Sequence, residues 1–193
     1  MNELREEYRY TWADLLALPE DTRAELIDGE IFMMSAPSWR HQEICGELFF
    51  RLRTYLEGKR CKAIYAPLDV RLFAQEGDGP EDVDTVVQPD VFVVCDPEKL
   101  DDSGCRGAPD MVIEVLSPST ARQDRYVKYL LYQRAGVKEY WIVDPENQTV
   151  AVHLLEDGIF GSPMIYTRSA VVPVESLDDC RIDLGEIFYT HEQ

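Results

Sequence analysis

The chain has 193 residues, 45% of them hydrophobic, which is enough for one globular domain with a real core, and we expect a single domain over residues 1–193. The formal net charge of −18 excludes a protein that coats nucleic acid by bulk electrostatics, because that affinity comes from Lys and Arg neutralising phosphates. The charged N-terminal segment lacks the apolar run of a signal peptide, and no apolar run is long enough to span a bilayer. We therefore expect a cytoplasmic protein without a membrane segment.

The cysteines are five in number and none forms a CxxC pair: Cys45, Cys61, Cys95, Cys105 and Cys180. This odd, scattered set indicates neither a disulfide framework nor a zinc knuckle. We expect most of them to be free thiols that fill apolar positions in a reducing cytoplasm.

The basic residues are concentrated in two windows. Residues 51–62 and 122–138 together hold ten of the nineteen Lys and Arg residues, whereas residues 76–102 hold ten acids against Lys99 alone. If both windows line one cleft, a polyanionic ligand is favoured; if they scatter, it is disfavoured.

The N-terminal third predicts a helix, a hairpin and a longer helix. A short amphipathic helix should begin at the N-cap Thr11 and end at Pro19. Two apolar runs joined by Asp28-Gly29, over residues 24–34, predict a β-hairpin. A helix should then run from about Ser38 to about Gly58, with its apolar residues at helical spacing and His41 on the same inward stripe.

The rest of the chain alternates strands with one helix. Strands are expected within residues 61–73, 86–94 and 111–117, and a helix from about Thr120 to Ala135, closed by Gly136 in a left-handed conformation. Short β segments follow at 139–143, 149–155 and 162–167. This order predicts an α/β or α+β fold in which helices flank a mainly antiparallel or mixed sheet.

Two carboxylates interrupt strands that are otherwise apolar. Glu114 lies in the run MVIEVLS, both faces of which are apolar, and Asp90 follows Pro89 just before VFVV. If the two strands are neighbours, Asp90 and Glu114 can lie side by side, where they would share a proton or hold a cation. Hard oxygen ligands without a His/Cys cluster favour Mg²⁺ or Mn²⁺. A Glu near a strand end that simply pairs with an Arg remains the alternative.

Lys128 lies on the helix that follows the Glu114 strand. It is one turn after Asp124 and one turn before Leu131 and Tyr132, so its stem could follow the apolar face toward the two acids. An ordinary i, i+4 pair with Asp124, or a solvent-facing charge, is the alternative.

Several motifs in order resemble the Uma-type restriction endonuclease family of the PD-(D/E)xK nuclease superfamily. They are ELIDGEI (25–31), SWRHQ (38–42), PLDVRL (67–72), QPD (88–90), APDMVIEVLSPST (108–120) and K-x3-Y-x3-GVKEYWIVDP (128–145). The resemblance is strongest over residues 24–145. It implies a restriction-endonuclease-like mixed sheet flanked by helices, and a divalent-metal-dependent endonuclease that hydrolyses phosphodiester bonds of DNA.

The resemblance also implies roles for particular residues. Asp90 would be the PD aspartate and Glu114 the second acid, with the backbone carbonyl of Val115 completing the protein ligands of the metal. The superfamily pattern places a lysine two residues after the second acid, but Leu116 stands there, and Lys128 occupies the matching place on the next helix.

Other residues are weaker candidates. His41 is a candidate catalytic group, although a histidine on an apolar stripe is more often part of the core. Glu25, Glu43 and Asp69 are expected to be supporting groups. Arg122 and Arg125 are candidate contacts to nucleic acid.

Two other classes of function stay open. A nuclease fold without turnover, acting as a binding module or partner subunit, would suit the charge of −18 better. A metal-dependent hydrolase of another phosphorylated substrate is the third possibility. No recognition domain is evident, so specificity could come from a homodimer.

Overall fold

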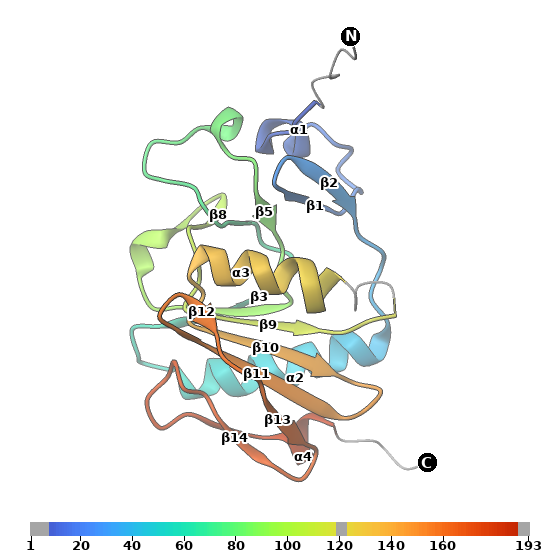
Figure 1. Cartoon of the computed structure of the whole chain (residues 1–193), viewed down its shortest axis with the longest axis vertical. Coiled ribbons are helices and arrows are strands. Elements are labelled where there is room, and N and C mark those ends of the chain that lie inside the picture. Colours follow the sequence, from blue (N-terminus) through green and yellow to red (C-terminus); the bar gives the residue numbers. More distant parts are fainter. Residues whose placement is uncertain (1–7, 119–122, 189–193) are drawn as a thin grey trace.

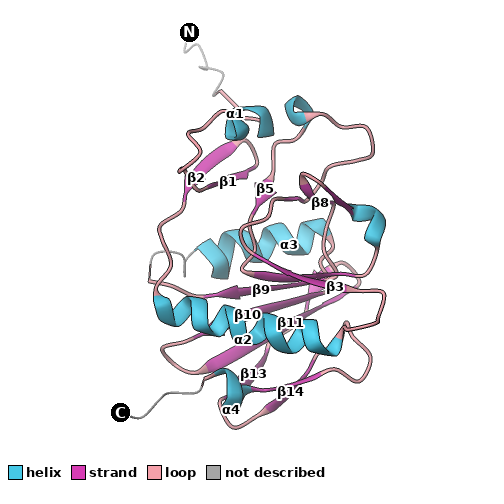
Figure 2. Ribbon diagram, turned by 180° about the vertical axis from the view of Figure 1, so that it is seen from behind, coloured by secondary structure: helices cyan, strands magenta, loops and turns pink. Residues whose placement is uncertain are grey.

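The computed structural model describes residues 8–118 and 123–188, which form an α+β fold with two main sheets (Figures 1 and 2). Sheet B is the larger, in the order β12-β11-β10-β9-β6-β3, with β13 also paired to β11. Its strands are β3 Lys62–Tyr65, β6 Val91–Val94, β9 Met111–Val115, β10 Glu139–Asp144, β11 Thr149–Glu156, β12 Ile159–Phe160 and β13 Met164–Thr167. It is mixed, because β9 and β10 are parallel whereas β6 pairs antiparallel with both β3 and β9.

Sheet A is built of short strands in the order β2-β1-β5-β4-β8-β7. These are β1 Ala24–Ile27, β2 Glu30–Met33, β4 Val70–Arg71, β5 Val86–Val87, β7 Leu100–Asp101 and β8 Gly104–Arg106. A third, two-stranded sheet joins β14 Val171–Pro173 to β15 Arg181–Asp183. The expected mixed sheet flanked by helices is therefore confirmed, with a second sheet beside it.

The helices cover both faces of sheet B. Helix α2, Trp39–Tyr55, packs Ile44, Leu48 and Leu52 into one core cluster with Ile113. Helix α3, Tyr129–Ala135, packs Tyr132 on the opposite face. Figure 1 shows α3 in front of the sheet, and Figure 2 shows α2 across its back. Both faces of β9 are thus buried, as its apolar pattern predicts. None of the described helices is long and apolar enough to cross a membrane.

The shorter helices are α1 Trp12–Leu16, η1 Pro80–Asp82, η2 Pro97–Lys99, η3 Gln123–Lys128 and α4 Leu184–Ile187. Helix α1 ends at Leu16, before the predicted end at Pro19. The helix expected over 120–135 is a π-helical turn, η3, that continues as α3 and ends at Gly136 with φ of +85°. Residues 120–122 of that prediction lie outside the described residues.

Local sequence signals account for several boundaries. Asp28 and Gly29 have φ of +50° and +80°, the left-handed pair that a tight hairpin turn requires, between β1 and β2. The Ser38 hydroxyl accepts a hydrogen bond from the backbone N–H of His41 at 3.2 Å and caps α2. The cap fixes where α2 begins and therefore where His41 lies.

The cysteine prediction was wrong for one pair. Cys61 and Cys95 form a disulfide with Cα atoms 3.9 Å apart, while Cys45, Cys105 and Cys180 are free and buried as expected. The reason is strand register, since Lys62 pairs with Val94 across β3 and β6 and the next residues outward are the two cysteines. Their 34-residue separation carries no sequence signal of this pairing.

Candidate active site

Strands β6 and β9 bring Asp90 and Glu114 together, as predicted. Val91 pairs with Ile113, so the residue before β6 lies beside the end of β9. The backbone N–H of Asp90 donates to Glu114 Oε2 at 3.4 Å, and the backbone N–H of Val115 donates to Asp90 Oδ2 at 2.8 Å. Pro89 separates β5 from β6, which leaves Asp90 outside the regular ladder with its side chain 17% exposed.

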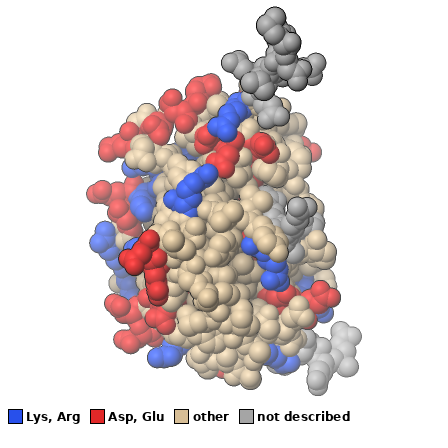
Figure 3. Space-filling view, in the orientation of Figure 1, with Lys and Arg blue, Asp and Glu red and all other residues tan. Residues whose placement is uncertain are grey.

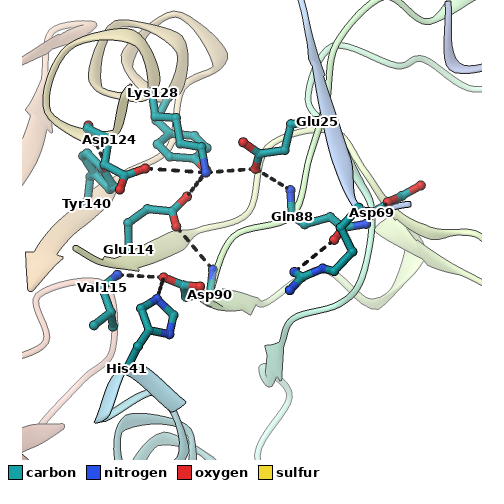
Figure 4. A network of polar contacts seen from close by, with 12 residues as sticks. Glu25, His41, Asp69, Gln88, Asp90, Glu114, Val115, Asp124, Lys128 and Tyr140 are labelled. Atoms are coloured by element: carbon teal, nitrogen blue, oxygen red, sulfur yellow. Dashed lines mark hydrogen bonds and ion pairs between the residues drawn. The ribbon is translucent and has the colours of Figure 1, made fainter. Parts of the chain in front are cut away.

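Lys128 reaches the same point from η3 (Figure 4). Its Nζ lies 2.9 Å from Glu114 Oε1, 2.8 Å from Glu25 Oε1 and 3.7 Å from Asp124 Oδ1, and no side chain of the four is more than 5% exposed. The i, i+4 contact with Asp124 does exist, but it is the longest of the three. Lys128 is therefore a buried ammonium held by acids from a strand of each main sheet and from its own helical turn.

Two tyrosines fix this arrangement. The Tyr132 hydroxyl donates to Glu114 Oε1 at 2.7 Å, and the Tyr140 hydroxyl donates to the backbone carbonyl of Asp124 at 3.0 Å. Both tyrosines are fully buried. Tyr132 and Tyr140 belong to the core that α3 covers, and their hydroxyls add polar contacts that an apolar pattern does not reveal.

The described part of the cluster contains more acids than basic groups. Glu25, Glu114 and Asp124 lie around the Lys128 ammonium, and Asp90 lies beside Glu114 and His41. Burial raises the pKa of Glu114 well above its usual value; Lys128 opposes this shift and the neighbouring acids add to it. Burial alone would lower the pKa of Lys128, but the carboxylates raise it well above its usual value, so it stays an ammonium.

His41 joins the cluster from the first turn of α2. Its Nε2 lies 3.1 Å from Asp90 Oδ2, and its Nδ1 lies 3.5 Å from the Sγ of Cys45 one turn later. Burial alone would lower the pKa of His41, but the hydrogen bond to Asp90 and the charge of that carboxylate outweigh burial and raise it. His41 therefore holds Asp90 in place, and the Asp90 carboxylate favours the imidazolium form of His41.

Sheet A supplies an outer layer of polar contacts. The backbone N–H of Gln88 donates to Glu25 Oε1 at 2.9 Å, and its side-chain amide donates to Asp69 Oδ1 at 3.0 Å. Asp69 also accepts from Trp12 Nε1 at 3.2 Å. Asp69 is therefore linked to Glu25, and so to the Lys128 cluster, through Gln88. Gln88 belongs to the QPD motif, but it was not among the residues predicted to support the site.

Some candidates lie away from the cluster. Glu43 is solvent-exposed on α2, two residues from His41, and so points to a different side of the helix. Arg125 is 45% exposed and pairs with Asp144 at 2.9 Å, and Arg122 lies outside the described residues. The two basic windows do not share a cleft, because residues 51–62 continue from α2 on one face of sheet B while η3 and α3 cover the other. This separation disfavours bulk attraction of a polyanion.

The donor set fits a hard divalent cation. Asp90 and Glu114 offer carboxylate oxygens, the type of ligand that Mg²⁺ or Mn²⁺ prefers. A softer set is also present, since His41, Cys45 and Asp90 have ligand atoms within 4.8 Å of one another. Burial, however, raises the pKa of the Cys45 thiol, which opposes the thiolate that a soft metal would need.

Comparison with known proteins places this geometry in a family. An uncharacterised protein of Synechocystis sp., slr1290, is 29% identical over 136 residues, which span 69% of this chain and 67% of that protein. A crystal structure from Anabaena variabilis, described as "a putative nuclease belonging to DUF820", has a TM-score of 0.72 at 23% identity and covers 92% of this chain and 97% of the other. That likeness confirms the restriction-endonuclease-like fold. The family model Uma2, described as "Putative restriction endonuclease", matches residues 12–184, and the chain therefore belongs to the Uma2 family.

Proposed function

We propose that the protein is a divalent-metal-dependent endonuclease that hydrolyses phosphodiester bonds of DNA. One observation carries the proposal: the Lys128 ammonium, Glu114 and Asp90 meet at one point, although they lie on η3, on β9 and just before β6. Membership of the Uma2 family supports the same class of reaction. The proposal assigns the metal to Asp90, Glu114 and the backbone carbonyl of Val115.

The residues of the chain have distinct tasks in this proposal. A bound divalent cation would polarise a phosphoryl oxygen and lower the pKa of a water molecule. Lys128, fixed by Glu25 and Asp124, would supply positive charge next to the phosphoryl group as negative charge develops there. It cannot serve as a general base, because its neighbours keep it protonated. His41 would hold the Asp90 carboxylate in one orientation.

The deciding experiment measures cleavage of plasmid and single-stranded DNA with Mg²⁺ or Mn²⁺. Wild type should cut, and Glu114→Gln and Lys128→Met should lose about two orders of magnitude or more in rate. Glu43→Gln, an exposed acid on α2, is the matched control and should retain full activity. Equal activity in wild type and both cluster variants would show that another site or a contaminant cuts the DNA.

Metal binding is tested separately from turnover. Calorimetric titration should find uptake of Mn²⁺ by wild type and its loss in Asp90→Asn, while far-UV circular dichroism shows that the variant is folded. If Mn²⁺ binds but no DNA is cut, the same variants should be assayed on phosphorylated small molecules. Uptake that survives in Asp90→Asn would refute the assigned ligand set.

A further inference from the structure

A groove of about 500 Å³ lies at the opposite end of β9 from the active-site cluster. Asp110, just before β9, lines it, and alternation along the strand puts Asp110 on the same face as Glu114. The other walls are the segments after β4 and β8 and the C-terminal end of α3 at Gly136. The groove and the active-site cluster therefore lie at the two ends of the contact between sheet A and α3, about 13 Å apart along β9.

The groove is basic in a strongly acidic protein. Lys99, Arg106 and Lys138 line it, together with Glu76 and Asp110. Lys99 Nζ donates to the backbone carbonyl of Ala108 at 2.7 Å, and Arg106 donates to that of Glu98 at 3.2 Å. The acceptors of these two hydrogen bonds are neutral carbonyl groups. They orient the Lys99 and Arg106 side chains without neutralising their positive charges.

Lys138 and Lys99 also act on the acid in the groove. Lys138 Nζ pairs with Asp110 Oδ1 at 2.7 Å while its side chain stays 68% exposed. Burial would raise the pKa of Asp110, but the hydrogen bond from Lys138 and the charges of Lys138 and Lys99 lower it. Both ammonium groups are therefore close to this carboxylate, and the groove retains a positive surplus.

The segment that runs between the two ends contains no acidic residue. Residues 125–138 contain no Asp or Glu, in a chain with 37 of them. Tyr126, Leu130 and Arg134 recur at helical spacing on the exposed side of η3 and α3, and Arg134 stacks on Phe73 at the groove and pairs with Asp28. Figure 3 shows the middle of this face largely tan, with most acidic side chains toward its margins.

We propose that this groove binds the DNA backbone at a phosphate three or four nucleotides from the bond that the cluster cuts. The inference rests on the proposed function. Its spacing follows from the eight-residue step from Lys128 to Gly136, about 12 Å of helix, and a rise of about 3.4 Å per nucleotide in a duplex strand. The exposed side of α3 lies between the groove and the cluster, and the absence of Asp and Glu from residues 125–138 suits a surface along which DNA runs.

Anisotropy of a labelled DNA duplex in EDTA measures binding without cleavage. The test variant removes the three groove charges with little change in side-chain size: Lys99→Gln, Arg106→Gln and Lys138→Gln. The matched control removes three exposed charges from the end of α2 and the start of β3: Arg53→Gln, Lys59→Gln and Lys62→Gln. Both variants should give the far-UV circular dichroism and melting temperature of wild type to within a few degrees.

The groove variant should bind about tenfold more weakly at low salt, and its slope of log K against log salt should fall by about one, for the phosphate that the variant no longer neutralises. The control should bind like wild type. Unchanged binding by the groove variant, or an equal weakening in the control, overturns the inference.

If wild type cuts DNA in Mg²⁺ while the groove variant binds normally, the groove proposal fails and the endonuclease stands. If the groove variant binds DNA more weakly but wild type cuts nothing, the proposed function fails alone.

Discussion

Replacing Lys128 with Met should destabilise the protein even where no metal or substrate is present. The substitution keeps the apolar stem and removes an ammonium that Glu25, Glu114 and Asp124 share, while all three acids stay at most 4% exposed. Breaking a buried ion pair from one side costs about 3–5 kcal/mol, because the partner that stays buried loses that counterion. For a chain of this length each kcal/mol lowers the melting temperature by about 2–4 °C, so the expected loss is about 6–20 °C.

Urea unfolding followed by circular dichroism in EDTA at pH 7.5 measures this loss. Lys138→Met is the matched control, because it removes an ammonium that pairs with Asp110 but is 68% exposed, and such pairs contribute about 0–1 kcal/mol. The difference in free energy of unfolding between wild type and Lys128→Met should become smaller as the pH falls. Burial already raises the pKa of Glu114, and the loss of Lys128 raises it further, so that protonation removes the buried charge. A group with a raised folded-state pKa stabilises the fold at low pH and loses that contribution as the pH rises.

The reasoning is refuted if Lys128→Met unfolds within about 0.5 kcal/mol of wild type at pH 7.5, which is the range of ordinary surface substitutions. If the loss in free energy of unfolding is the same at pH 7.5 and at pH 5, it results from altered packing and not from the loss of the charge.

Three further predictions concern the rest of the fold. Burial lowers the pKa of His153 from 6.5, so wild type should lose stability as the pH falls from about 7 through that lowered value; urea titrations at pH 7.5 and pH 5 should show a smaller loss for His153→Phe. Leu48→Ala, in the fully buried stripe of α2, should cost about 2–5 kcal/mol in urea unfolding, whereas the 61% exposed Phe50→Ala should cost under about 1 kcal/mol. Mass spectrometry after alkylation should find Cys61 and Cys95 protected until reductant is added, and reduction should lower the free energy of unfolding by about 2–4 kcal/mol.

The sequence predicts those parts of the site that follow from local pattern. A carboxylate inside a run that is apolar on both faces is costly unless it has a partner, and this cost singles out Glu114 and Asp90. The sequence leaves open whether the two strands are neighbours, and the register of β6 with β9 shows that they are. Lys128 needed the family resemblance, because helical spacing alone also allowed a simple pair with Asp124.

The parts that were missed depend on how separate elements dock. Glu25 was expected only to support the site, yet it is an ion-pair partner of Lys128 that sheet A supplies from β1. No local pattern encodes the approach of β1 to η3. Likewise, the Cys61–Cys95 bond depends on the register of β3 with β6. The two basic windows, residues 51–62 and 122–138, also depend on how elements dock. Basic residues that are close along the chain need not lie on one surface of the fold.

The position of Lys128 between the two main sheets ties the chemistry to global folding. Glu25 belongs to one sheet and Glu114 to the other, so neither sheet alone contains the full set of charges around the ammonium. A partly unfolded chain that keeps sheet B intact would lose the contact of Glu25 with Lys128 and would have no complete centre. Amide hydrogen exchange in β1 and β9 should therefore report the same opening event, and any residual cutting should vanish together with it.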